Sequence, residues 1–159
     1  MCHSRRTGKR RDSTGEFNYV LQGTPGNDGC DDNNIIATSA KDDIEFGWEI
    51  VKKLGELDIG QAIVVKDKEV IAVEAIEGTA EMIERAGRFC KSGGWTLIKV
   101  SKPQQDMRFD VPCVGPDTIR SLAKNGGKCL VVEAGKTIII DKPETIKLAN
   151  QLGITIFGC

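Results

Sequence analysis

The stretch that decides the fold is GQAIVVKDKEVIAVEAIEGTAEMIERAG, residues 60–87. It contains two apolar runs, 61–66 and 69–75, joined by the polar turn Lys66-Asp67-Lys68, and this pattern is typical of two paired strands. Further along, apolar residues recur at helical spacing, and these are Met82, Ile83 and Ala86. The stretch therefore predicts two strands followed directly by a helix.

Upstream of this stretch, the sequence predicts another helix. Its apolar residues are spaced for one helical face, and they are Ile44, Trp48, Val51 and Leu54. Acidic residues occupy the expected first turn, and either Ser39 or Asp42 is suited to cap it. We therefore expect ordered structure to begin near Ser39.

Downstream, strands and helices continue to alternate, with proline at helix starts and glycine at helix ends. The expected elements are a strand at 95–100, a helix from Pro116 to Asn125, a second hairpin of strands 128–134 and 136–141 across Ala134-Gly135, a helix from Pro143 to Gly153 and a strand at 154–158. Hairpins beside crossover helices predict an α/β fold, a layered domain with a mixed β-sheet and flanking helices.

The first forty residues differ from the rest in composition. They hold the basic run SRRTGKRR and the tract TPGNDGCDDNN, which has no hydrophobic period. We therefore predict an irregular or disordered segment over 1–40 and a catalytic-type domain over 41–159. A basic arm for RNA is the alternative for SRRTGKRR, but a solvated tail is favoured.

Composition excludes several classes of function. The net charge is −1, which argues against nucleic acid as a partner of the whole molecule. No apolar run approaches the ~20 residues of a membrane span, and the N-terminus lacks the apolar core of a secretory signal. We therefore expect a cytoplasmic protein, with membrane contact limited to the periphery.

The cysteines and the histidine exclude further sites. The six cysteines include no CxxC pair, so a zinc site is not expected, and we interpret them as reduced thiols. Cys113 and Cys129 are predicted to be small buried residues. The only histidine, His3, lies in the basic tail, which argues against a histidine-based catalytic triad.

One candidate site is the turn VEAIEGT. Glu74 breaks the apolar alternation of its strand, and Glu77 and Gly78 lead into a helix that Thr79 is suited to cap. Free N–H groups at a helix start suit a phosphate, which two carboxylates would repel unless a cation lay between them. The turn therefore indicates Mg²⁺ with phosphate, while a surface Glu77 and a simple cap are the equally weighted alternative.

The other candidate is KPQQDMRFDVPCVGPDTI, residues 102–119, which follows a strand and precedes a helix. In extended chain Asp106, Arg108 and Asp110 share one face, because residues two apart point the same way. Carboxylates suit Mg²⁺, Arg108 suits a phosphate, and Lys102 adds charge for a diphosphate. Spacing alone favours a self-neutralised surface strip over a site.

Three separated motifs, taken together, carry a resemblance to a known family. They are LDIGQAIVVKDKEVIAVEAIEGTAEMIERAG, KPQQDMRFDVPCVGPDTI and VVEAGKTIIIDKPETIKLANQLGITIFG. In this order they resemble the C-terminal domain of the LpxI-type UDP-2,3-diacylglucosamine pyrophosphatases, over roughly residues 42–158. The resemblance implies a bacterial enzyme of lipid A biosynthesis that hydrolyses the diphosphate of UDP-2,3-diacylglucosamine to UMP and lipid X. It also implies a divalent cation such as Mg²⁺ and the cytoplasmic face of the inner membrane.

The resemblance also assigns tasks to the two candidate stretches. Asp106 and Asp110 become the first candidates for holding Mg²⁺ or positioning water, and Arg108 for holding phosphate. The residues implied to complete the metal or phosphate site are Glu74, Glu77, Gly78 and Thr79, and the implied ligand contacts are Lys102, Gln61 and Gln105. A peripheral contact with the inner membrane and a homodimer are both compatible with it.

The sequence departs from the family in one respect. Full-length members carry an N-terminal domain that encloses the substrate with this one, and the first forty residues here do not resemble it. A truncated homologue without catalysis, acting as a nucleotide-sugar, phosphate or interaction module, is therefore the alternative function. Glu133, at a strand end, is interpreted as structural.

Overall fold

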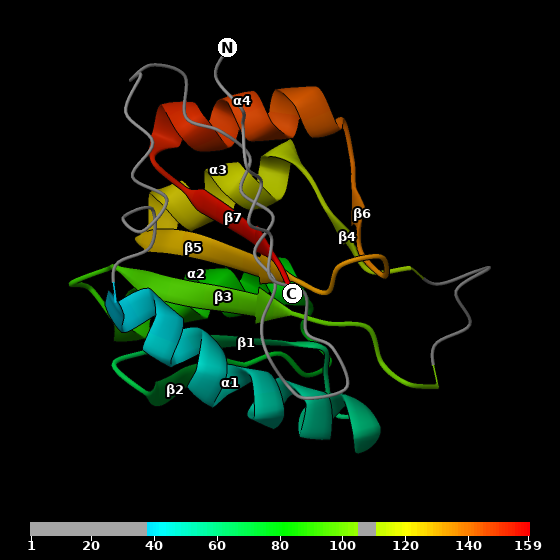
Figure 1. Cartoon of the computed structure of the whole chain (residues 1–159). Coiled ribbons are helices and arrows are strands. Elements are labelled where there is room, and N and C mark those ends of the chain that lie inside the picture. Colours follow the sequence, from blue (N-terminus) through cyan, green and yellow to red (C-terminus); the bar gives the residue numbers. More distant parts are fainter. Residues whose placement is uncertain (1–37, 105–110) are drawn as a thin grey trace, which may run out of the picture.

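The computed structural model describes residues 38–104 and 111–159 (Figure 1). Helices and strands alternate along these ranges. The helices are α1 (Thr38–Glu56), α2 (Thr79–Phe89), α3 (Pro116–Asn125) and α4 (Lys142–Leu152). The strands are β1 (Ala62–Lys66), β2 (Glu69–Val73), β3 (Trp95–Lys99), β4 (Cys113–Val114), β5 (Gly127–Val132), β6 (Ile138–Ile139) and β7 (Thr155–Gly158).

Five strands form one mixed sheet in the order β2-β1-β3-β5-β7. Strand β1 is antiparallel to both β2 and β3, whereas β3, β5 and β7 run parallel to one another. Strands β4 and β6 form a separate two-stranded parallel sheet. The predicted α/β fold, with a mixed sheet and flanking helices, is confirmed.

The helices cover the two faces of the large sheet unequally (Figure 1). Helix α1 packs on one face, where Trp48 and Val51 share a core with Ile98 and Phe157. Helices α2, α3 and α4 contribute to the core on the other face. Helix α1 lies very close to the sheet, since a Cβ on Gly47 would be 2.5 Å from Cδ1 of Ile98.

The turn between β1 and β2 has the geometry that a tight hairpin requires. Asp67 and Lys68 both have positive φ, 53° and 60°, as in the turns whose twist matches that of paired strands. The buried carboxylate of Asp43 accepts the N–H of Lys68 over 2.8 Å. Helix α1 therefore stabilises the turn as well as covering the sheet.

The second predicted hairpin is wrong. Strand β5 is paired on both sides, with β3 and with β7, so neither of its edges is left for β6. Of the apolar run after Gly135, only Ile138 and Ile139 form a strand, and they pair with Cys113 and Val114 of β4. The chain therefore leaves the large sheet at this point.

The topology places one set of strand ends together. Strands β2, β3, β5 and β7 point the same way, so their carboxyl ends and the start of β1 share one edge, on the right of Figure 1. In α/β folds this is the edge where ligands bind. Within residues 38–104 and 111–159, no helix has the length and apolarity that crossing a bilayer requires.

Gly60 lies at this edge against the backbone of the neighbouring strand. A Cβ there would lie 1.8 Å from the carbonyl oxygen of Glu74, which is a severe steric clash. We expect Gly60→Ala to lower the free energy of unfolding by about 3 kcal/mol, measured by urea denaturation.

Gly55→Ala is the matched control. Its added methyl group would meet Pro103 at 3.6 Å, an ordinary contact, and we expect a change below about 0.5 kcal/mol. Equal stability of the two variants would contradict the close contact between Gly60 and the backbone of Glu74.

Candidate functional site

Two clusters of buried polar side chains lie at the carboxyl edge of the sheet, on opposite faces. Alternation along the strands places Glu74 beyond Ala72 and Lys99 beyond Leu97, on the face covered by α2, α3 and α4. It places Glu133 beyond Val131, on the face covered by α1. The sheet therefore separates a Glu74 cluster from a Glu133 cluster.

Glu74 is buried and only partly satisfied. Its side chain follows β2, and the residue is 5% exposed. One carboxylate oxygen, Oε1, accepts the hydroxyl of Thr79 over 2.6 Å. The other, Oε2, is buried and has no hydrogen-bond partner among the described residues. A buried oxygen of this kind is costly unless a ligand, an ion or water satisfies it.

Lys99 joins this cluster from the end of β3. The residue is 7% exposed, and its ammonium group donates to Oγ1 of Thr79 over 3.0 Å and to the carbonyl oxygen of Cys113 over 3.2 Å. Sequence reasoning missed Lys99. The signal was available, because a lysine interrupts the apolar run WTLIKV just where the strand ends.

The start of α2 differs in one respect from the prediction. The residue at the cap position is Gly78, with φ 84°, and no side-chain cap is present among the described residues. Thr79 is the first helical residue and uses its hydroxyl on Glu74, so the predicted Thr79 cap is wrong. A Cβ on Gly78 would meet no atom of the described residues within 4 Å, so the helix start is open on their side.

Glu77 is engaged within the turn. One oxygen forms an ion pair with Arg85, and the other accepts the N–H of Ala75 over 3.1 Å. The backbone N–H of Glu77 itself, and then Arg85, hold the pKa of this carboxyl below its usual value. Its proposed role as a metal ligand stays a prediction, and the structure shows its oxygens occupied by protein groups.

Two further predicted contacts lie at the same edge. The amide oxygen of Gln61, just before β1, is buried and has no partner in the described part of the chain. The ammonium group of Lys102 contacts Asp58 over 2.8 Å, and this contact lowers the pKa of Asp58. Gln61 therefore has an acceptor to offer a ligand, while Lys102 already has an acidic neighbour.

The remaining predicted residues, Gln105, Asp106, Arg108 and Asp110, lie outside the described residues. In the sequence they lie between β3 and β4. The carbonyl of Cys113, at the start of β4, accepts a hydrogen bond from Lys99. Within residues 38–104 and 111–159, no three acidic, cysteine or histidine side chains come together as a metal would need.

The Glu133 cluster is fully satisfied. Its Oε1 contacts Lys52 at 2.9 Å and Lys136 at 3.0 Å, while Oε2 accepts the N–H and the hydroxyl of Ser101, each over 3.0 Å. Burial raises the pKa of Glu133, but the hydrogen bonds from Lys52, Ser101 and Lys136 together outweigh it and lower this pKa to about 2. The structural role interpreted for Glu133 agrees with these contacts.

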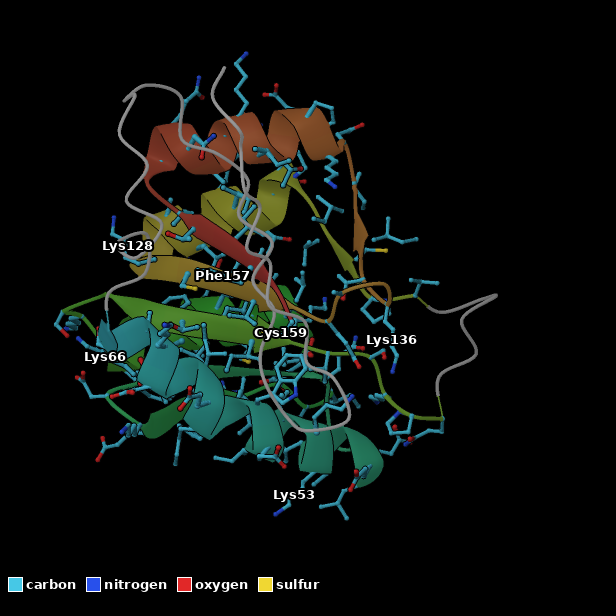
Figure 2. The ribbon with its side chains drawn as sticks, viewed as in Figure 1. Lys53, Lys66, Lys128, Lys136, Phe157 and Cys159 are labelled. Carbon is cyan, nitrogen blue, oxygen red and sulfur yellow. The ribbon has the colours of Figure 1, made fainter. Side chains whose placement is uncertain are left out.

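In Figure 2, labelled lysines mark the two edges of the sheet at which the strands begin and end. Lys136 lies at the carboxyl edge, whereas Lys66 and Lys128 lie at the opposite one. Lys66 donates there to the hydroxyl of Ser92 over 2.8 Å and to the carbonyl of Gly93 over 2.7 Å. These bonds hold the segment before β3 against the end of β1. Polar contacts at that edge therefore close turns.

Among the described residues, Cys90, Cys113 and Cys129 are free thiols. Cys129 is buried as predicted, and burial raises its pKa to about 12, so it stays protonated. The prediction for Cys113 is wrong, because its side chain is exposed while its carbonyl faces Lys99. In a two-residue strand such as β4, only Val114 points into the core.

Comparisons with known proteins agree with the resemblance found in the sequence. The sequence model of the LpxI C-terminal domain matches residues 27–157, a range that holds every candidate site residue. The UDP-2,3-diacylglucosamine pyrophosphatase LpxI of Caulobacter vibrioides is 37% identical over 124 residues, which cover 73% of this chain and 44% of that protein. The chain thus spans less than half the length of this curated relative.

The lowered pKa of Glu133 predicts a pH-dependent contribution to stability. A carboxyl whose pKa is about 2 when folded and near 4.5 when unfolded stabilises the fold above pH 4.5 and loses this effect as the pH falls towards 2. We expect Glu133→Gln to lower the free energy of unfolding at pH 7 by on the order of 2 kcal/mol. The difference from wild type should vanish near pH 2 in urea titrations.

The exposed Glu84 of α2 offers a matched control. We expect Glu84→Gln to differ from wild type by less than about 0.5 kcal/mol at every pH. A Glu133→Gln deficit that stays unchanged from neutral pH down to the acid end of the titration would contradict the assignment.

Proposed function

The chain belongs to the LpxI C-terminal domain family, and on this premise we propose that it acts in the hydrolysis of the diphosphate of UDP-2,3-diacylglucosamine. The products would be UMP and lipid X, in bacterial lipid A biosynthesis. The observation that carries the proposal is the 37% identity to the LpxI of C. vibrioides, a protein named for this pyrophosphatase activity.

The geometry of the Glu74 cluster supports hydrolytic chemistry. Among the described residues, a buried carboxylate with one unsatisfied oxygen lies beside a helix start without a side-chain cap. Two hydrogen bonds connect this carboxylate to a buried ammonium group. The positive end of α2 and the Lys99 charge favour a phosphate, and the carboxylate accepts a proton or binds a cation.

Mg²⁺ is part of the proposal. The unsatisfied Oε2 of Glu74 fits a hard cation, which prefers oxygen ligands. Asp106 and Asp110 are the other proposed ligands, with Glu77 as the weaker glutamate because its oxygens already bind Arg85 and Ala75. When bound, the cation would supply polarisation of the diphosphate and a more acidic water.

The remaining residues are proposed to bind and orient the substrate. Arg108 would contact a phosphate bidentately. Lys102 would add positive charge, and its contact with Asp58 would be replaced by one with the diphosphate. Gly78 leaves the start of α2 open to a phosphate. The proposed polar contacts are Thr79, Gln61 and Gln105.

The cellular setting is proposed on the same basis. A substrate with two acyl chains resides in a membrane, so we propose a cytoplasmic protein that contacts the inner membrane peripherally. A homodimer belongs to this proposal as well. The alternative function is a non-catalytic module that binds a nucleotide sugar or phosphate.

The direct test is UMP release from UDP-2,3-diacylglucosamine in the presence of Mg²⁺. We expect Asp106→Ala, Asp110→Ala and Glu74→Gln each to lower kcat by about 100-fold or more, because each removes charge at the reacting diphosphate. Glu77→Gln should cost less than about tenfold, because the oxygens of Glu77 are engaged by Arg85 and Ala75 and it is the weaker of the proposed ligands.

Calorimetric titration with the substrate separates the two functions. Full activity in both aspartate variants would contradict the site. A folded wild-type chain that binds the substrate without releasing UMP would favour the non-catalytic module.

A further inference from the structure

Lys99 is buried at a position where an ammonium group is expensive. Among residues 38–104 and 111–159 it is the buried basic side chain, and it lies at the end of the central strand of the sheet. Moving a charged amine out of water costs several kcal/mol unless fixed partners compensate. Salt-bridged surface lysines such as Lys68, whose side chain is 58% exposed, carry no such cost. Lys99 therefore needs fixed partners, and Thr79 and Cys113 are two of them.

The direction of the hydrogen bonds follows from the chemistry of the groups. An ammonium group only donates, so Oγ1 of Thr79 must accept the bond of 3.0 Å from Lys99. The hydroxyl proton of Thr79 is then directed to the other neighbour, Oε1 of Glu74, at 2.6 Å. A hydroxyl that donates to a carboxylate at this distance forms a short, charge-assisted bond.

This order leaves one oxygen of Glu74 for a ligand. Because Oε1 is occupied by the Thr79 hydroxyl, the carboxylate is held in one orientation, with Oε2 unsatisfied among the described residues. Two other charged groups nearby, Glu77 of the turn and Arg85 of α2, form an ion pair with each other. Thr79 therefore links Lys99 to Glu74 in the described part of the cluster.

We infer that Lys99 is a positioning residue: by donating to Thr79 it fixes the Thr79 hydroxyl proton on Glu74 and so presents Oε2 of Glu74 to the ligand. This inference rests on the proposed function insofar as the ligand is the diphosphate substrate with its cation. Lys99 also fixes the start of β4 through the carbonyl of Cys113, which places two elements of the site relative to β3.

A thermodynamic cycle tests the link itself. Lys99→Met and Glu74→Gln are combined in three backgrounds, namely wild type, Thr79→Val and Thr79→Ser, and urea midpoints are measured for each. Valine keeps the shape of threonine without the hydroxyl, and serine keeps the hydroxyl. We expect the two changes to be non-additive in the wild-type and Thr79→Ser backgrounds, and this coupling to fall by more than half in the Thr79→Val background. Equal coupling in all three backgrounds, or none in wild type, overturns the inference.

Kinetics separate positioning from simple stability. Lys99→Met and Thr79→Val should each lower kcat for UMP release about tenfold or more with a smaller change in KM, because a misoriented Glu74 affects the reacting diphosphate more than the loss of one contact affects substrate binding. Thr79→Ser should recover most of that loss. A folded Lys99→Met variant with wild-type kcat overturns the inference. If wild type releases no UMP, the proposed function fails, and the urea cycle still decides the link.

Discussion

The pairing of β1 with both of its neighbours sets the position of the described candidate residues. Ala62 is paired with Lys99 of β3, and the carbonyl of Ala62 accepts the N–H of Glu74 over 2.8 Å. Residues far apart in the chain therefore lie level across the sheet. Alternation along each strand then directs Glu74 and Lys99 to the same face, under the start of α2. A slip of one residue in either pairing would separate them.

Two buried glutamates at this edge show how similar positions acquire different tasks. Glu133 is 8% exposed and Glu74 is 5% exposed, so burial does not distinguish them. Glu133 has two lysines and Ser101 on its oxygens, whereas Glu74 has one hydroxyl and an oxygen without a partner in the described residues. Satisfied groups stabilise a fold, and a group left incomplete is where a ligand gains most.

The sequence was informative wherever the signal was local. The hairpin turn, the proline at the start of α3 and the glycines after α3 and α4 are all read from a few neighbouring residues, and the structure has them. The VEAIEGT turn was also found, because Glu74 interrupts an apolar strand. Local chemistry therefore predicted most of the fold and one half of the described site.

Features that depend on distant partners could not be predicted in this way. The run containing Ile138 looks like a hairpin strand, and only the occupation of both edges of β5 sends it to β4. The lysine that interrupts WTLIKV was a visible signal for Lys99, but its contacts with Thr79 and Cys113 could not be read from the spacing. Thr79 resembles a cap until Glu74 is placed beside it.

The bond between Lys99 and the carbonyl of Cys113 has a consequence for how this protein can vary. It joins residues 14 positions apart, and so it closes a ring of chain with one end in β3 of the large sheet and the other in β4 of the small sheet. Ring closure becomes only slightly more costly as a chain lengthens, by about 0.6 kcal/mol for each doubling. Insertions between these two residues are therefore inexpensive for the fold itself, so the length of this segment is set by the task of its side chains and not by the stability of the sheet.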